Sequence, residues 1–209
     1  MKISKLLKNN LENPIIYNFF EKIAGVSRPR KKFVEEFIKP KENEKILDIG
    51  CGTGELLDFF PKKINYLGID NNFEYIKYAK KKYKDRGEFI CSEIGSDKKI
   101  IKDEYFDIVM SAGVIHHLDD NSSKKLLEES MRVLKKGGRF VSFDPLLIKN
   151  QRLISRLLVQ NDRGNFVRNI KKYENLLKET FKNYKLFHKN DLHYYNYDIL
   201  IMTAYKWKK

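Results

Sequence analysis

The stretch that most constrains the fold of this 209-residue chain is an apolar run that leads directly into closely spaced glycines. It reads Ile46-Leu47-Asp48-Ile49-Gly50-Cys51-Gly52-Thr53-Gly54, and Asp70 follows about twenty residues after the first of these glycines. The apolar run predicts a buried strand, and the glycines predict a tight turn that lets a ligand lie against bare backbone. In a doubly wound sheet, a carboxylate placed like Asp70 ends the next strand and accepts hydrogen bonds from ribose hydroxyls.

The spacing of the glycines narrows the kind of ligand that this turn would take. Gly50, Gly52 and Gly54 form G-x-G-x-G, whereas turns that bind a pyrophosphate carry G-x-G-x-x-G. The pattern therefore favours a nucleoside ligand without a diphosphate.

Strands and helices are expected to alternate over the central part of the chain, because short apolar runs alternate with segments of helical periodicity. Strands are expected at 45–49, 65–69, 88–91, 106–111 and 139–143, and helices at 29–38, 55–60, 73–83 and from about Ser122 to Gly137-Gly138. The helix at 73–83 places Phe73, Ile76, Ala79 and Tyr83 on one face. Such alternation predicts a parallel sheet with right-handed crossovers and a ligand at the carboxyl ends of its strands.

Two further stretches complete an ordered set of motifs. The first runs from Phe106 to Leu118 and ends in Ile115-His116-His117-Leu118, and the second is Leu134-Lys135-Lys136-Gly137-Gly138-Arg139-Phe140. With the glycine loop and Asp70, they resemble the motifs of class I S-adenosylmethionine-dependent methyltransferases over residues 44–144. The resemblance implies an α/β, Rossmann-like, doubly wound sheet of seven mostly parallel strands in a single domain spanning 1–209. Residues 1–40 would form an N-terminal helical cap, and 145–209 an acceptor-side segment with the final strands, at 184–188 and 199–205.

The resemblance also implies which residues hold the cofactor, S-adenosyl-L-methionine. They are Asp48, Gly50, Cys51, Gly52, Asp70, Asn71, Ser92, Glu93, Ile94, Ser111, Ala112 and Gly113. One position departs from the family, which often has Gly-Asp where this chain has Ser92-Glu93. Either the longer Glu93 accepts a hydrogen bond from the adenine amino group, or it turns away and the Ser92 hydroxyl and backbone take that role. Asp70 has a plainer alternative role as the N-cap of the following helix.

His117, with His116 beside it, is the candidate for proton removal from the acceptor, since an imidazole titrates near neutral pH. The alternative is that these histidines order the loop. Adjacent histidines point in different directions and no further ligands lie at metal-binding spacing, so no metal is expected.

The methyl acceptor is expected to contact residues 1–40 and 145–195, with Tyr17, Arg163 and Arg168 as candidates; for the two arginines a solvated turn is the alternative. The chain lacks an Asn/Asp-Pro-Pro-aromatic loop after the strand at 106–111, which an exocyclic-amine methylase would carry. A small-molecule acceptor is therefore preferred. RNA is the first alternative and a non-catalytic Rossmann-like interaction module the second.

The net charge of +14 would attract a polyanion, but only nine of the 42 basic residues are arginines and the lysines are dispersed. The two cysteines do not suggest a disulfide framework, so a cytoplasmic location is expected. No stretch approaches the roughly 20 apolar residues of a membrane span. The sequence gives no indication of the oligomeric state.

Overall fold

The computed structural model describes residues 27–93, 101–160, 164–192 and 197–207. The strands are β1 (Lys45–Ile49), β2 (Asn65–Asp70), β3 (Glu88–Cys91), β4 (Phe106–Ala112), β5 (Leu134–Pro145), β6 (Asn183–Lys189) and β7 (Ile199–Tyr205). The longer helices are α3 (Ser27–Phe33), α4 (Phe73–Tyr83), α5 (Asp120–Val133), α6 (Leu153–Gln160) and α7 (Ile170–Thr180). Four short helical turns are η1 (Val34–Ile38), η2 (Glu55–Phe59), η3 (Lys84–Arg86) and η4 (Ile115–His117).

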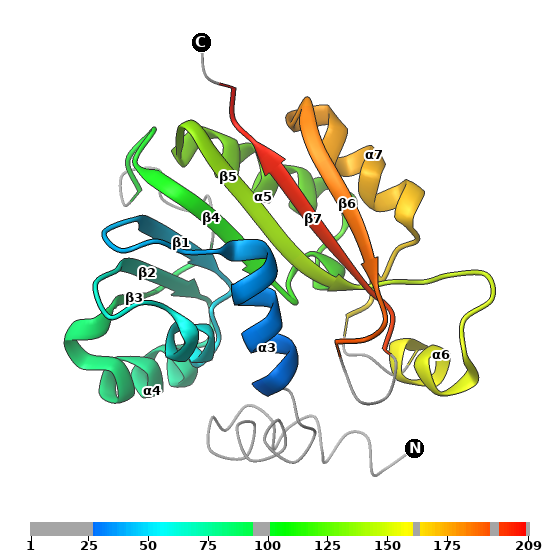
Figure 1. The fold of residues 1–209 in the computed structure, drawn as a ribbon, viewed down its shortest axis with the longest axis horizontal. Helices are drawn as coiled ribbons and strands as arrows, with labels where there is room; N and C mark the ends of the chain where they lie inside the picture. Colours follow the sequence, from blue (N-terminus) through cyan, green and yellow to red (C-terminus); the bar gives the residue numbers. More distant parts are fainter. Residues whose placement is uncertain (1–26, 94–100, 161–163, 193–196, 208–209) are drawn as a thin grey trace.

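All seven strands lie in one sheet, in the order β3-β2-β1-β4-β5-β7-β6 (Figure 1). The first five are parallel, and β7 runs antiparallel to both β5 and β6. The strand order reverses at β1, which pairs with β2 on one side and β4 on the other. Parallel sheets bind ligands beyond the carboxyl ends of the strands at such a reversal. The predicted mostly parallel, doubly wound sheet of seven strands is confirmed.

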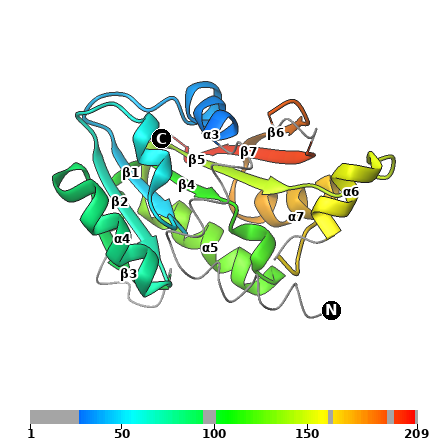
Figure 2. The same cartoon turned by 90° about the horizontal axis from the view of Figure 1, so that it is seen from below.

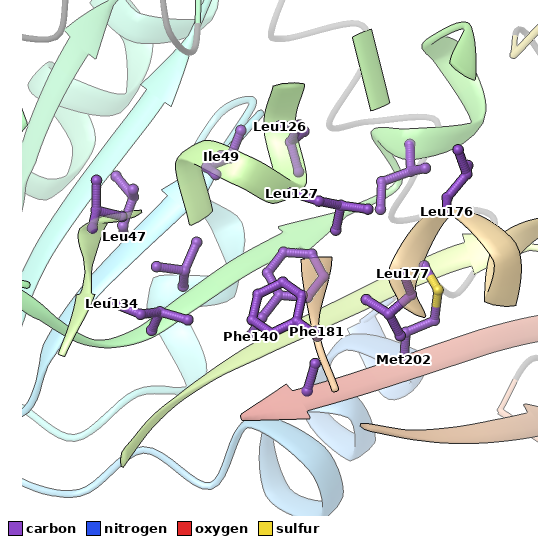
Figure 3. Close-up of a cluster of buried hydrophobic side chains, with 14 of the residues drawn as sticks. Leu47, Ile49, Leu126, Leu127, Leu134, Phe140, Leu176, Leu177, Phe181 and Met202 are labelled. Carbon is purple, nitrogen blue, oxygen red and sulfur yellow. The ribbon is translucent and has the colours of Figure 1, made fainter. Parts of the chain in front are cut away.

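Two apolar clusters hold the helices on opposite faces of the sheet (Figure 2). One cluster joins the sheet to α5 and α7, and Figure 3 shows Leu127, Phe140, Leu177, Phe181 and Met202 meeting at its centre. The rings of Phe140 and Phe181 stack with centroids 5.7 Å apart. Burying each such side chain contributes about 1.5–3 kcal/mol.

The second cluster involves the described part of the expected cap. Phe33 and Ile38, from α3 and η1, are buried on the sheet face beside Ile46, Ile108 and Val141. Residues 27–38 therefore cover a sheet face, and the single helix expected from Pro29 to Ile38 is an α-helical turn followed by a π-helical one. The rest of the cap lies outside the described residues.

The boundary between α5 and β5 corrects the sequence prediction. The helix was expected to run through Leu134 and stop at Gly137-Gly138, yet it ends at Val133, and Leu134 pairs with Phe106 of β4. Leu134 is fully buried, so pairing and burial in the sheet outweigh its helical periodicity. Gly138 sits within β5, where a Cβ would lie 3.0 Å from the carbonyl oxygens of Asp107 and Lys135.

One apolar residue of α4 was also placed wrongly. Ile76, Ala79 and Tyr83 are buried as expected, but Phe73 is 63% exposed. Phe73 is the first residue of α4, after the N-cap Asn72, and only the residues farther along the helix pack over the sheet. No helix within the described residues is long and apolar enough to cross a membrane.

Candidate cofactor and active site

The glycine loop makes its turn against the end of β2. The backbone N–H groups of Gly50 and Cys51 both donate to the carbonyl of Ile69, at 2.7 and 3.0 Å. Gly50 and Gly52 have φ of +71° and +55°, in the left-handed region that favours glycine. A Cβ on Gly52 would meet no atom within 4 Å, whereas one on Gly50 would lie 2.3 Å from a methyl group of Val114. Gly52 therefore leaves room for a ligand, while Gly50 is fixed by packing against the protein itself.

Asp70 is bound into this loop by its carboxylate. One oxygen accepts the Gly52 N–H at 2.9 Å, and the other accepts the Asn72 N–H at 2.8 Å. The N-cap of α4 is Asn72, whose side chain accepts from Glu74 and Tyr75, so the N-cap alternative for Asp70 is wrong. A carboxylate has about four lone-pair sites, and two remain for donors on a ligand. A ribose with two neighbouring hydroxyls supplies that pair of donors.

A cavity of about 600 Å³ opens beside the loop. Of the expected cofactor residues, those that line it are Gly50, Gly52, Asp70, Asn71, Ser92, Glu93, Ala112 and Gly113. The cavity is also lined by residues that were not expected from the sequence, among them Asn72, Tyr75, Val114, Leu118, Ser122 and Lys125. Tyr75 lies on α4 next to the buried Ile76, and Ser122 and Lys125 lie in the first turns of α5. The one signal in the sequence for these three residues is that both helices begin just after the carboxyl ends of strands, where the ligand is expected. Ile94 lies outside the described residues.

Asp48 does not line the cavity. It is almost fully buried in β1, and one carboxylate oxygen accepts the Tyr66 hydroxyl at 2.7 Å. Burial raises the pKa of Asp48 to about 7, and the negative charge of Asp70 adds to this rise, while the Tyr66 hydrogen bond and Arg30 oppose it. Its other oxygen has no hydrogen-bond partner. Asp48 therefore supports the loop from behind, through the strand that carries it.

Cys51 and Ser111 also lie off the cavity, contrary to expectation. The Cys51 side chain packs on β2, where a Cβ added to Gly68 would lie 2.8 Å from its Sγ, and burial raises its thiol pKa well above the usual value. Ser111 is fully buried in β4, because side chains alternate along a strand and its neighbour Ala112 takes the cavity side.

The two histidines differ in exposure, although their rings lie with centroids only 4.1 Å apart. His117 is exposed and lines the cavity, whereas His116 is only 4% exposed and does not. The Nδ1 atom of His116 lies 2.9 Å from an oxygen of the buried Asp144, whose pKa is raised chiefly by desolvation. The structure therefore places His116 away from the cavity, which does not agree with the expectation that it serves as a base at the site. Of the two histidines, only His117 lines the cavity.

Of the three acceptor-side candidates, the structure describes one. Tyr17 and Arg163 lie outside the described residues. Arg168 is 5% exposed, and its guanidinium binds backbone carbonyls and Asp120, so the expectation that it contacts an acceptor is wrong. Within the described part of the chain, no three His, Cys, Asp or Glu side chains converge as a metal site would need.

The sequence is similar to those of known methyltransferases. Residues 47–142 match the model of a methyltransferase domain. A demethylmenaquinone methyltransferase of Thermotoga maritima is 29% identical over 136 residues, which cover 64% of this chain and 57% of the relative. A tRNA (carboxymethyluridine(34)-5-O)-methyltransferase of Arabidopsis thaliana is 34% identical over 101 residues, covering 44% of this chain and 22% of that protein. The chain thus spans little more than half of the first relative and about a fifth of the second.

The fold is shared more widely than the sequence. The crystal structure of a SAM-dependent methyltransferase from Archaeoglobus fulgidus superposes with a TM-score of 0.72 at 21% identity, covering 91% of this chain and 99% of that one. At this identity the likeness shows the fold. Together with the matched segment, it confirms the resemblance drawn from the glycine loop, Asp70 and the later motifs. Residues 47–142 therefore match a methyltransferase domain, and the chain has the Rossmann-like sheet of a known SAM-dependent methyltransferase.

Proposed function

We propose that this protein is an S-adenosylmethionine-dependent methyltransferase that transfers the methyl group to an O, N or C nucleophile of a small-molecule acceptor. The observation that carries the proposal is the coupling of Asp70 to the Gly52 N–H at the edge of a cavity of about 600 Å³. Asp70 retains two acceptor sites for a ribose, and Gly52 keeps the loop side of the cavity free of side-chain atoms.

The other cavity residues have roles that follow from their chemistry. Asn71, Ser92 and Glu93 follow the ends of β2 and β3 and would hold the adenine end of the cofactor. Ala112 and Gly113, at the end of β4, would present backbone to its amino-acid end. The bound cofactor supplies an activated methyl group, so the protein mainly has to align the acceptor and exclude water. His117 would accept a proton from a hydroxyl or amine acceptor.

Two features of the chain favour a small-molecule acceptor. The turn after β4 carries Ala112-Gly113-Val114 in place of an Asn/Asp-Pro-Pro-aromatic loop, and Arg168 is engaged inside the protein. The relatives are divided, since one is named for a quinone precursor and another for tRNA. RNA is therefore the alternative acceptor.

The cofactor is tested by titrating the purified protein with S-adenosylhomocysteine in a calorimeter. We expect binding that weakens at least ~10-fold in Asp70→Ala, because two hydrogen bonds to a charged carboxylate are lost. The matched control is Asp85→Ala, an exposed acid on η3, which should bind as the unaltered protein does. An absence of binding would contradict the proposal and favour the non-catalytic interaction module.

The acceptor is tested with labelled cofactor against total RNA, DNA and a deproteinised metabolite extract. Label in the low-molecular-weight fraction supports the proposal and identifies the acceptor by mass. Label at one defined nucleotide of RNA overturns the small-molecule acceptor but leaves the methyltransferase activity standing. A salt titration of RNA binding separates specific recognition from the general attraction of a +14 chain.

A further inference from the structure

The turn that carries the two histidines is held by a segment about fifty residues later in the chain. Arg168 donates to the carbonyl of Ile115 at 3.1 Å and to the carbonyl of Leu118 at 2.7 Å. These two carbonyls flank His116 and His117, so a single guanidinium spans the turn. Between them, the Phe166 N–H donates to the carbonyl of His116 at 2.9 Å.

Arg168 is fully committed to this position. Its remaining donors reach the Phe166 carbonyl at 2.9 Å and one carboxylate oxygen of Asp120, which accepts from Nε at 3.0 Å and from Nη2 at 2.7 Å. A guanidinium has five N–H donors, and these contacts provide a partner for each. Arg168 is itself held to the end of β5, because its carbonyl accepts the Leu147 N–H at 3.1 Å.

The side chain of His116 is fixed from two further directions. One carboxylate oxygen of Asp144 accepts a hydrogen bond from the His116 backbone N–H at 3.1 Å. The same oxygen lies 2.9 Å from Nδ1 of the His116 ring. Gly164 lies directly against the ring, where an added Cβ would be 2.1 Å from Cδ2 and 2.6 Å from the His116 carbonyl oxygen. His116 is thus enclosed by β5 on one side and by residues 164–166 on another.

His117 lies against the enclosed ring of His116. Its ring packs on that of His116 with centroids 4.1 Å apart, and it faces the cavity that His116 does not reach. We propose that Asp144, Gly164, Phe166 and Arg168 form a clamp that sets the place of His117 in the cavity, and that Arg168 is its main positioning residue. The catalytic consequence rests on the proposed function, whereas the placement of His117 does not.

The clamp accounts for why an arginine is needed at 168. Lysine keeps the charge but has a single ammonium in place of the planar fork, so it cannot bind the Ile115 and Leu118 carbonyls together with the same geometry. Arg168→Lys should therefore loosen the turn without removing charge from the protein. Misplacement by about 1 Å can lower a rate by about 10²-fold even when the chemistry is untouched.

The test is histidine NMR on the full chain labelled at imidazole Cε1, which needs no acceptor. The chain has four histidines, so single substitutions assign the signals. In Arg168→Lys, the His116 and His117 signals should shift and the pH titration of His117 should move, while the His188 signal stays in place. The matched control is Arg86→Lys, because Arg86 also binds backbone carbonyls, those of Leu57 and Phe60, away from the histidine turn. Arg86→Lys should leave all histidine signals unchanged, even if it lowers the melting temperature as much as Arg168→Lys does.

A second variant keeps the test decisive if Arg168→Lys does not fold. Gly164→Ala presses on the His116 ring and should shift the same two signals. Histidine signals unchanged in either folded variant, or changed equally in Arg86→Lys, would overturn the clamp.

Activity adds a separate readout once an acceptor fraction has been labelled. Arg168→Lys should lower kcat several-fold with little change in KM or in S-adenosylhomocysteine affinity, and it should cost far less in a protein already carrying His117→Ala. Additive losses would overturn the action through His117. If the protein binds no cofactor, the proposed function fails, and the NMR result still decides whether the clamp exists.

Discussion

The buried carboxyl of Asp48 makes the stability of this protein depend on pH in an unusual direction. Burial raises its pKa from 3.8 to about 7, so the folded state keeps a proton that the unfolded chain releases between these two values. Stability therefore falls as the pH rises from about 4 to about 7. At about 1.36 kcal/mol for each pKa unit, the loss amounts to about 4 kcal/mol by pH 8.

Asp48→Asn tests this calculation, because the amide keeps the shape of the side chain but cannot ionise. The unfolding free energy should be measured by urea denaturation of both proteins from pH 4 to pH 8. The amide also introduces donors into a buried place, which shifts its stability by a constant amount, so the difference between the two proteins is followed against pH. We expect the original chain to lose about 4 kcal/mol relative to the variant across this range. Parallel curves would refute the reasoning.

A companion variant tests the direction of the effect. The hydroxyl of Tyr66 donates to Asp48 and lowers its pKa, against the larger effect of burial. Tyr66→Phe removes this donor, so the decline in stability should keep its slope but extend to higher pH, which makes the total loss larger. A decline that ends at lower pH in Tyr66→Phe would contradict the assigned causes.

Three other predictions follow from the packing and the cavity. Gly50→Ala should lower stability by about 2–4 kcal/mol through backbone strain and overlap with Val114, and Val114→Ala should restore part of that loss in chemical denaturation. His117→Ala should lower the methyl-transfer rate by less than about 10²-fold, because alignment contributes more than a base; a loss of 10²–10⁴ with intact cofactor affinity would show that proton removal dominates. Phe73→Ser should change the unfolding free energy by no more than about 0.5 kcal/mol, whereas Ile76→Ala should cost about 2–5 kcal/mol, and equal effects would contradict the observed exposure.

The central sheet could be predicted well because its strands are short apolar runs between strong turn signals. The bounds of β1, α4, β3 and β7 agree with the sequence prediction. The start of β5 could not be found in this way, since Leu134 continues the periodicity of α5 and only its pairing with β4 excludes it from the helix. Local pattern and tertiary pairing conflict there, and the pairing prevails.

At the site too, residues placed by local pattern could be predicted, and residues defined by distant contacts could not. Gly52, Asp70 and His117 could be placed at the cavity because each lies at the end of a strand or in the turn that follows one, where the fold itself determines the position. The role of Arg168 could not be predicted, because every contact that defines it lies two or more residues away and most lie about fifty away. An isolated arginine in a polar stretch carries no local sign that its five donors are buried. Asp48 was expected at the cofactor because it belongs to a clear motif. Its hydrogen-bond partner, Tyr66, lies on the next strand, and the motif does not reveal that contact.

The position of β7 has a consequence for how the protein is made. Although β7 comes after every other strand in the sequence, it lies inside the sheet, between β5 and the edge strand β6. During synthesis, seven residues of β5, from Arg139 to Pro145, must wait for residues 199–205 before their outer backbone groups find partners. An unpaired edge of that length invites association with other chains. We therefore expect chains truncated before Ile199 to aggregate as they are produced, although the glycine loop, Asp70 and both histidines are already present in them.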